Sequence, residues 1–529
     1  MSERKMSLES INSLVRERIT LSKANRDILD LLDIPLTLAQ LNLFAPTMKG
    51  INKIYINIVL QEKEKELKIN KDIKDKILHL TINSVIASEI NLTTILNLPS
   101  LNKLHLGDNI ILFSLIFLSN SSLLEDLVID NCSNCTNITN LMNCTNLRSI
   151  KLDYMNKITN ISPLSYCIHL KHLELKQCTN LEDLSGIETL SKLEYLFVHD
   201  NNVLQKLDIL QDCKRLDSLI ISKCSALNDI SVLNHISTLT KLSFYNCAIL
   251  SDLTGLWNSL LLNTLIIAYC PQISNLIPIA GCTNLIALSV TSCPLLEYLD
   301  FLTGCDKLQS LIINNCNNIS KWSPLTLCPK LTNLDLSACK GVNNLNVFSK
   351  CKELKVLILN DCTSLYSLET LDSEGLETLN LNRCDNLSSV FGIQRCSNLL
   401  VLSLAECPLI EEISSLAGCF NLQSLILNSC TEIKSLFGLQ NCINLQELSL
   451  SFCIDLSDIL EVGNCSELRR IDLSYCNSLI DVSVLGLCTN LEYIDLNHSC
   501  LLTDVTSLDN CIKIKYLLVK GCGKLKGLE

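Results

Sequence analysis

Thirty cysteines recur along this 529-residue chain at nearly constant spacing, and thiols placed in this way could hold metal ions, form disulfides or act as nucleophiles. In residues 465–488, CSELRRIDLSYCNSLIDVSVLGLC, three of them lie 11 and then 12 residues apart. A zinc site is suggested by the C-x-x-C pair of Cys132 and Cys135 with Cys144 nearby, but no second pair completes four ligands. Because Cys132 and Cys144 belong to the regular series, only Cys135 is left over, and a packing role is favoured over a metal site.

Acid–base or nucleophilic catalysis would need histidines in a recognised catalytic frame, and the seven histidines show none. His172 and His199 fall at outward strand positions of adjacent repeats, near Glu174, where we expect solvated or partner-contacting imidazoles. No glycine-rich phosphate loop follows any expected strand. The sequence therefore predicts a protein that is not an enzyme and that has no cofactor and no catalytic or structural metal.

Composition and charge limit the cellular compartments and the kinds of partner that we expect for this protein. The first residues lack the apolar core of a signal peptide, and no run of 18 uncharged apolar residues is present, so we expect no membrane span. The thiols are then expected to be reduced, in the cytoplasm or the nucleus. A net charge of −12 argues against broad nucleic-acid binding by the repeats.

A repeat of 23 residues positions the cysteines. Its first leucine recurs from Leu124 to Leu491, with Ile514 in the last unit and one shorter step of 22 that ends at Leu376. Apolar residues occupy positions 1, 4, 6, 9, 12, 15, 18 and 21 of each unit. The alternation at positions 4 and 6 predicts a short strand, and the spacing of three that follows predicts a tight, 3₁₀-like return path. Such coils bury their apolar rows only by stacking, which places the strands in one parallel sheet.

The cysteines fill two slots of this repeat. The ninth position is cysteine in fifteen units and the twenty-first in thirteen. Elsewhere these slots carry Met155, Asn201, Ser499, Leu190, Ile236 or Ser259, with Glu374 as the exception in the shortened unit. The slots thus favour small or apolar groups, and a buried thiol has the size of a small hydrophobic group and can donate weakly to a backbone carbonyl.

The segment LRRIDLSYC (468–476) fits L-x-x-L-x-L-x-x-N/C, the core of the leucine-rich repeat, and about 450 residues of the chain resemble that family. Cysteine at the ninth position resembles the class found in substrate receptors of ubiquitin ligases. The short return path ITNISPLSYCIHL (158–170) is similar to the repeats of internalins, phosphatase-regulatory proteins and trypanosomatid cyclase-regulatory proteins. The resemblance implies an α/β-type solenoid, a curved array with a parallel concave sheet and an irregular or 3₁₀ convex side.

The ends of the array differ from its middle. Residues 1–75 do not repeat and predict a small helical N-terminal cap or docking segment, with helices ending before Pro35 and Pro46, ahead of a solenoid of about 20 repeats over residues 76–529. The last strand is rich in lysine, and self-association through that edge is a hypothesis.

Function in a solenoid depends on residues that the repeat leaves free, at positions 3, 5, 7 and 8 of the concave face. The central units are plain there, whereas aromatic and charged residues gather toward both ends, as protein interfaces do. The N-terminal cluster comprises His172, Glu174, Tyr195, Phe197, His199, Tyr245 and Tyr269, and the C-terminal cluster comprises Glu447, Phe452, Arg470, Asp472, Tyr475, Tyr493, Asp495 and Tyr516.

We therefore predict a non-catalytic interaction scaffold or regulatory or adaptor subunit that binds a protein partner on its concave face. One alternative is a substrate-recognition subunit of a ubiquitin ligase, docked through the N-terminal helices. The other is a thiol-rich metal-binding or redox protein, which would show bound zinc or thiols that react in the folded state.

Overall fold

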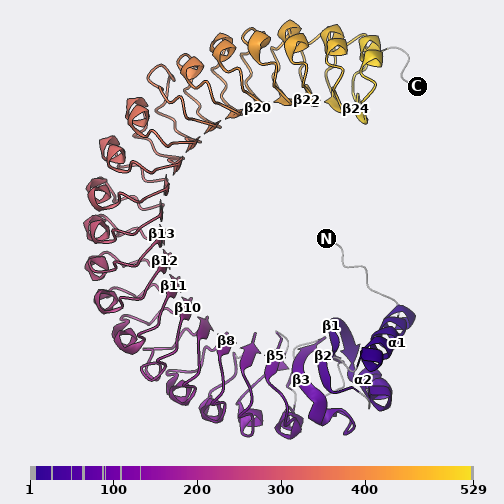
Figure 1. Cartoon of the computed structure of the whole chain (residues 1–529), viewed down its shortest axis with the longest axis vertical. Helices are drawn as coiled ribbons and strands as arrows, with labels where there is room; N and C mark the ends of the chain where they lie inside the picture. The colour runs from indigo at the N-terminus through magenta and orange to yellow at the C-terminus, as the bar shows by residue number, and fades with distance from the viewer. Residues whose placement is uncertain are drawn as a thin grey trace. The chain divides into compact units, whose positions relative to one another are not determined.

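The computed structural model describes residues 8–25, 28–48, 51–61, 66–85, 88–89, 91–107, 110–131 and 133–525. The chain forms two compact units, Met1–Leu261 and Leu262–Glu529. Within each unit the strands lie side by side along the inner side of an arc, and the 3₁₀ segments follow the outer side (Figure 1). The expected solenoid with a parallel sheet and a 3₁₀ return path is confirmed.

The sheet of the first unit follows the repeat register. Its strands are β1 (Ile28–Thr37), β2 (Lys53–Leu60), β3 (Ile77–Ser84), β5 (Lys103–Leu106), β7 (Asp126–Ile129), β8 (Ser149–Asp153), β9 (His172–Lys176), β10 (Tyr195–His199), β11 (Ser218–Ser222) and β12 (Lys241–Tyr245), with a separate short pair β4 (Ser88–Glu89) and β6 (Ile110–Ile111). Neighbours in this sheet are parallel, and Tyr195 pairs with Ser218 as Ser218 pairs with Lys241. Each repeat therefore places its equivalent side chains directly beside those of the next repeat.

The second unit continues the same pattern, with five-residue strands from β13 to β15 and three-residue strands from β16 onward. They are β13 (Thr264–Ala268), β14 (Ala287–Thr291), β15 (Ser310–Asn314), β16 (Asn333–Asp335), β17 (Val356–Ile358), β18 (Thr378–Asn380), β19 (Val401–Ser403), β20 (Ser424–Ile426), β21 (Glu447–Ser449), β22 (Arg470–Asp472), β23 (Tyr493–Asp495) and β24 (Tyr516–Leu518). From β16 to β23 the sixth position is leucine, whereas β13 to β15 carry Ile or Val there. The sixth residue does not by itself set the length of the strand, because β8 and β9 also carry leucine there and are five residues long.

The return paths are built from 3₁₀ helices. These are η1 (Ala45–Met48), η2 (Lys74–Lys76), η3 (Thr93–Asn97), η4 (Ile116–Leu118), η5 (Thr139–Asn143), η6 (Ser162–Tyr166), η7 (Asp208–Asp212), η8 (Ser231–His235), η9 (Thr254–Leu256), η10 (Ile277–Gly281), η11 (Asp300–Gly304), η12 (Ser323–Leu327), η13 (Asn346–Lys350), η14 (Ile393–Arg395), η15 (Ser414–Gly418), η16 (Leu439–Asn441), η17 (Leu460–Asn464), η18 (Ser483–Leu487) and η19 (Thr506–Asn510). Many follow an Asp or Asn whose Oδ1 accepts the amide two residues later, as Asp481 does from Ser483 N at 2.7 Å. In those repeats this local bond supplies the turn that starts the return path.

The N-terminal segment is less helical than its sequence suggested. The first helix, α1 (Leu8–Asn25), ends before Ile28 instead of reaching Pro35, and α2 (Leu38–Phe44) matches the second expected helix. Between and after them, β1 and β2 extend the parallel sheet. Buried residues alternate along β1 and β2, which is the period of a strand, and a register shift between Leu31 and Pro35 accommodates the proline. The purely helical assignment is therefore wrong for residues 28–37.

Leucine, isoleucine and cysteine side chains form the core between sheet and return path. In the later repeats the ninth-position thiol donates to the sixth-position carbonyl of the preceding repeat, as from Cys339 to Ile313 O at 3.0 Å and from Cys430 to Leu404 O at 3.1 Å. Where cysteine is replaced, Ser499 Oγ donates to the equivalent carbonyl of Leu473 at 2.7 Å. The slot thus holds a hydrogen-bond donor as well as a small side chain.

The shortened unit corrects one residue assignment. Ser373, which is 7% exposed, and not Glu374, occupies the position of the twenty-first-slot cysteine. Its carbonyl accepts from Leu376 N, as Cys351 O accepts from Leu354 N in the preceding unit. The missing residue therefore lies in the return path between Leu371 and Ser373, and the strands stay in register, with Val356 beside Thr378.

Candidate partner-binding surfaces

The N-terminal cluster lies on outward positions of β9, β10 and β12, except for Tyr269, which follows β13 in the second unit. The rings of His172 and Tyr195, on neighbouring strands, have their centroids 6.0 Å apart. They line a shallow recess together with Glu194, Asp217, Ser218 and Lys241. Among the described residues, no ring contact joins Tyr245 or Tyr269 to the rest of the cluster. The structure thus brings together the part of the cluster on β9 and β10.

A salt bridge and two ring contacts link the other residues of β9 and β10. Lys176 Nζ lies 2.8 Å from Glu174 Oε2 and 5.0 Å from the ring centroid of Phe197. The Phe197 and His199 centroids are 5.8 Å apart. Burial, together with the charge of Lys223, lowers the pKa of His199, so its imidazole is neutral at pH 7. The lysine is therefore held by both a carboxylate and an aromatic face.

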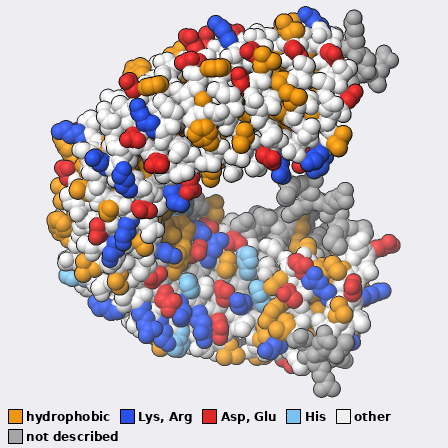
Figure 2. All heavy atoms as spheres, turned by 45° about the horizontal axis from the view of Figure 1, so that its top comes forward, with side chains coloured by type: hydrophobic (Ala, Val, Ile, Leu, Met, Phe, Trp, Pro, Cys, Tyr) orange, Lys and Arg blue, Asp and Glu red, His pale blue; other side chains and the backbone are white. Residues whose placement is uncertain are grey.

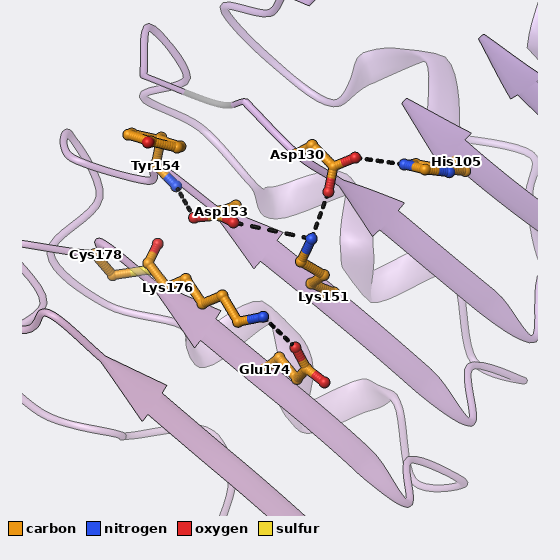
Figure 3. Close-up of polar contacts among 8 residues, drawn as sticks. All are labelled: His105, Asp130, Lys151, Asp153, Tyr154, Glu174, Lys176 and Cys178. Carbon is orange, nitrogen blue, oxygen red and sulfur yellow. Dashed lines mark hydrogen bonds and ion pairs between the residues drawn. The ribbon is translucent and has the colours of Figure 1, made fainter. Parts of the chain in front are cut away.

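A charged network beside this cluster was missed from the sequence (Figure 3). His105 Nε2 and Lys151 Nζ each lie 2.5 Å from a carboxylate oxygen of Asp130, and Lys151 is 3.9 Å from Asp153. Partial burial would raise the pKa of Asp130, but the hydrogen bonds from His105 and Lys151 outweigh it and lower that pKa to about 2. Burial raises the pKa of Asp153. Opposite charges at positions 5 and 7 of successive units are the signal that could have revealed this network.

Acidic, basic and histidine side chains are interspersed on the surface in the space-filling view, alongside stretches without charge (Figure 2). The outward residues of β13 to β15 include Thr264, Ile266, Ser310 and Ile312 and carry no charge. Paired polar and aromatic groups are therefore confined to parts of the sheet face rather than spread along it.

In the C-terminal cluster, the residues at the third position of the repeat, which are the first residues of β21 to β24, form a continuous row. Arg470 Nε lies 3.7 Å from Glu447 Oε1, and its guanidinium carbon lies 4.2 Å from the ring centroid of Tyr493. The rings of Tyr493 and Tyr516 follow, with centroids 6.2 Å apart. Each side chain is thus supported by its neighbours on adjacent strands, as expected for cross-strand pairs.

A second row of rings stands at the eighth position, just past the strands. Phe452 and Tyr475 are stacked, with centroids 4.3 Å apart and planes inclined by 7°, and Tyr475 and His498 stack at 4.6 Å and 16°. The eighth residue was expected on the sheet face, but it lies after the strand in a left-handed turn. Its φ is 61° at Phe452 and Tyr475 and 60° at His498.

This left-handed turn recurs in the repeats from Tyr154 to His498, and the residues that adopt it include no Val, Ile or Thr. The absence of β-branched residues at the eighth position is a sequence signal for the turn, because such residues tolerate a positive φ poorly. The turn fixes the direction of the eighth side chain in every such repeat. The aromatic stack is therefore held by the backbone as well as by ring contacts.

The thiols have the properties of packing groups. The described cysteines form no disulfides, and all of them except Cys500 are buried. Burial raises the pKa of many of them, to about 12 for Cys178 and Cys476. Among the described residues, no three His, Cys, Asp or Glu side chains are grouped as metal ligands would be, and Cys132 lies outside these residues. Neutral, enclosed thiols are poor nucleophiles and poor ligands.

Comparisons with known proteins agree with this architecture. A family model described as "BspA type Leucine rich repeat region" matches residues 154–274 in 6 copies. No curated protein matches the chain. The solved structure of the TLR13–ssRNA13 complex is 18% identical, with a TM-score of 0.63, over 93% of this chain and 79% of that one. A leucine-rich-repeat protein of Leptospira interrogans is 17% identical, with a TM-score of 0.56, over 77% of this chain and 99% of that one. An internalin of Listeria monocytogenes is 19% identical over 71% of this chain and 88% of that one, with a TM-score of 0.39 that adds nothing to the fold assignment.

A search of the described residues for a helix long and apolar enough to cross a membrane found none.

Proposed function

We propose that this leucine-rich-repeat protein is a non-catalytic scaffold or regulatory subunit that holds a protein partner on the concave sheet face. The observation that supports this most is the C-terminal cluster, where Glu447, Arg470, Tyr493 and Tyr516 form one supported row on four strands. Tyrosine and arginine are the side chains that most often carry binding energy in protein interfaces. The leucine-rich-repeat fold itself is typical of proteins that bind other proteins.

Preorganisation strengthens this proposal. A flexible arginine or tyrosine loses about 0.5–1.5 kcal/mol of side-chain entropy when a partner immobilises it. The ring and ion-pair contacts within the row restrict Arg470 and Tyr493 before binding, so less of this cost remains. A partner with complementary shape would then gain the contact energy at a smaller entropic cost.

We propose that the N-terminal segment acts chiefly as a cap for the first repeats. Val15 and Ile19 of α1 are buried, and Arg18 forms a two-pronged ion pair with Asp33, at 2.6 and 2.8 Å. These contacts tie α1 to the start of the sheet. If the segment instead docks a ligase core, as the ubiquitin-ligase alternative requires, removal of α1 alone will abolish partner capture.

The test is affinity capture from native cells with the full chain and four variants. One variant carries Arg470→Ala, Tyr493→Ala and Tyr516→Ala, a second carries His172→Ala, Tyr195→Ala and Phe197→Ala, and a third lacks residues 1–27. The control carries Phe391→Ala, Phe437→Ala and Leu460→Ala, which removes large exposed side chains from the return path instead of the sheet face. Loss of one partner with either sheet-face variant but not with the control is the expected result. Equal capture by all variants would refute binding on the sheet face.

A further inference from the structure

The C-terminal cluster has more negative than positive charge. On the outward positions of β21 to β23 and the turns after them, the carboxylates of Glu447, Asp472 and Asp495 face a single guanidinium, that of Arg470. Arg470 is paired with Glu447, and no described cation forms an ion pair with Asp472 or Asp495. This part of the sheet therefore presents two carboxylates without cationic partners.

These two carboxylates are direct neighbours. Asp472 and Asp495 pair across β22 and β23, where parallel strands lie about 4.8 Å apart. Like charges directly opposite each other in a sheet destabilise it. Asp472 Oδ1 accepts from Ser474 N at 2.9 Å and Oγ at 2.7 Å, and Asp495 Oδ1 accepts from Asn497 N at 2.9 Å. The hydrogen bonds fix both carboxylates in place without neutralising their charge.

Aromatic rings flank the carboxylate pair on both sides along the strands. The third-position row contains Tyr493, and the eighth-position row contains Tyr475 and His498. Arg470 over Tyr493 shows that a guanidinium fits against a ring of this surface, since the distance of 4.2 Å is well inside cation–π range. An acidic row between two aromatic rows is complementary to a cationic side chain with an apolar stem.

We propose that the C-terminal cluster binds an extended basic segment of the protein partner, with an arginine or lysine side chain placed over Asp472 and Asp495. This inference rests on the proposed function and adds the chemistry of the partner. The cation would relieve the repulsion between the two carboxylates, and the apolar stem that carries it would contact the rings of Tyr475 and Tyr493. Such charge-assisted contacts are about twice as strong as neutral hydrogen bonds, and they fix the register of the bound segment.

The test measures binding of fluorescent octapeptides to the purified full chain by anisotropy at 150 mM salt. The probes are Arg-Ser and Glu-Ser alternating peptides, and a third in which citrulline replaces arginine. The variant Asp472→Asn with Asp495→Asn keeps the shape and the hydrogen-bonding oxygens. Its matched control, Glu411→Gln with Glu412→Gln, removes the same charge from an exposed part of the return path.

We expect the arginine peptide to bind the parent chain and the control alike and to bind the Asp472→Asn, Asp495→Asn variant at least tenfold more weakly. Tyr475→Ala with Tyr493→Ala should weaken binding about fivefold, because the apolar stem of the bound side chain loses its contact with the two rings. Equal losses in both charge variants would show general attraction to an acidic protein and overturn the proposal. Equal binding of the citrulline or glutamate peptide would also overturn it. If no basic peptide binds while the sheet-face variants still lose a captured partner, the basic-segment proposal fails and the scaffold proposal stands.

Discussion

The ninth-position slot permits a sharp test of why cysteine recurs in this chain. Ser499, fully buried, donates its hydroxyl to Leu473 O at 2.7 Å and accepts from Cys476 N at 3.2 Å. Ser499→Ala removes both bonds and leaves a buried carbonyl and a buried amide without these partners. Ser499→Cys restores a donor of the kind found in the neighbouring repeats, as Cys476 donates to Leu450 O at 3.3 Å.

The expected magnitudes separate a donor requirement from a size requirement. Leaving a buried polar group unsatisfied costs about 1–3 kcal/mol, so Ser499→Ala should lower the free energy of unfolding by that amount. Ser499→Cys should change it by less than about 1 kcal/mol, because the weaker S–H bond is offset by greater apolar burial. If the slot selects only small side chains, alanine and cysteine will both be tolerated.

Urea unfolding followed by circular dichroism gives the free energies, provided the slope with denaturant is unchanged between variants. Because a repeat array can unfold in parts, hydrogen exchange of the peptide covering residues 470–500 supplies a local measure. Ser499→Ala should speed exchange of the Cys476 amide, and Ser499→Cys should speed it less. Stability of Ser499→Ala equal to that of the parent chain would refute the donor explanation.

Three further outcomes are expected. Maleimide at pH 7.5 should label Cys500 in the folded chain far faster than the buried described cysteines, and rapid labelling of many thiols before unfolding would revive the redox alternative. Ala338→Val should destabilise the chain by about 1–2 kcal/mol, because a β-branched residue is forced to a φ of 56°, whereas Ala287→Val on a strand should be tolerated; equal stabilities would contradict the left-handed turn. Asp130→Asn should cost about 2 kcal/mol at pH 7, since the pKa of Asp130 falls from 3.8 to about 2 on folding. A depressed carboxyl pKa stabilises the fold above pH 4, so the difference between the two chains in urea titrations should shrink as the pH falls from 4 toward 2.

Most of the fold could be predicted from the period of the repeat. The strand at positions 4 and 6, the spacing of three in the return path and the burial of both cysteine slots all follow from the packing of one coil on the next. The first strand was not predicted because Ile28–Thr37 contains charged residues and a proline, and without a known partner strand these residues resemble the end of a helix. The alternation of buried and exposed residues in this segment identifies a strand only when its pairing with β2 is known, and β2 is distant in the sequence.

The candidate surface was less accessible to sequence reasoning. Tyr493 and Arg470 could be assigned to an outward face from their positions alone, whereas Tyr475 was expected on the sheet face and lies in the turn after the strand. The pairing of Arg470 with a ring, and of Tyr475 with two others, depends on side-chain directions that the repeat does not specify. The network around Asp130 was missed because its members come from positions 5 and 7 of different repeats, and each one alone resembles a solvated charge.

The shortened unit shows which part of each repeat is free to vary in length. One residue is absent between Leu371 and Ser373, yet Val356 and Thr378 remain paired and the inner ladder continues without a shift. Gain or loss of residues during evolution can therefore be absorbed on the outer side while the order of side chains on the inner side is inherited unchanged. For the same reason, the stretch around Asp372 is a natural place for an inserted tag or domain. An insertion there lengthens the chain without changing the spacing of the residues that face a partner.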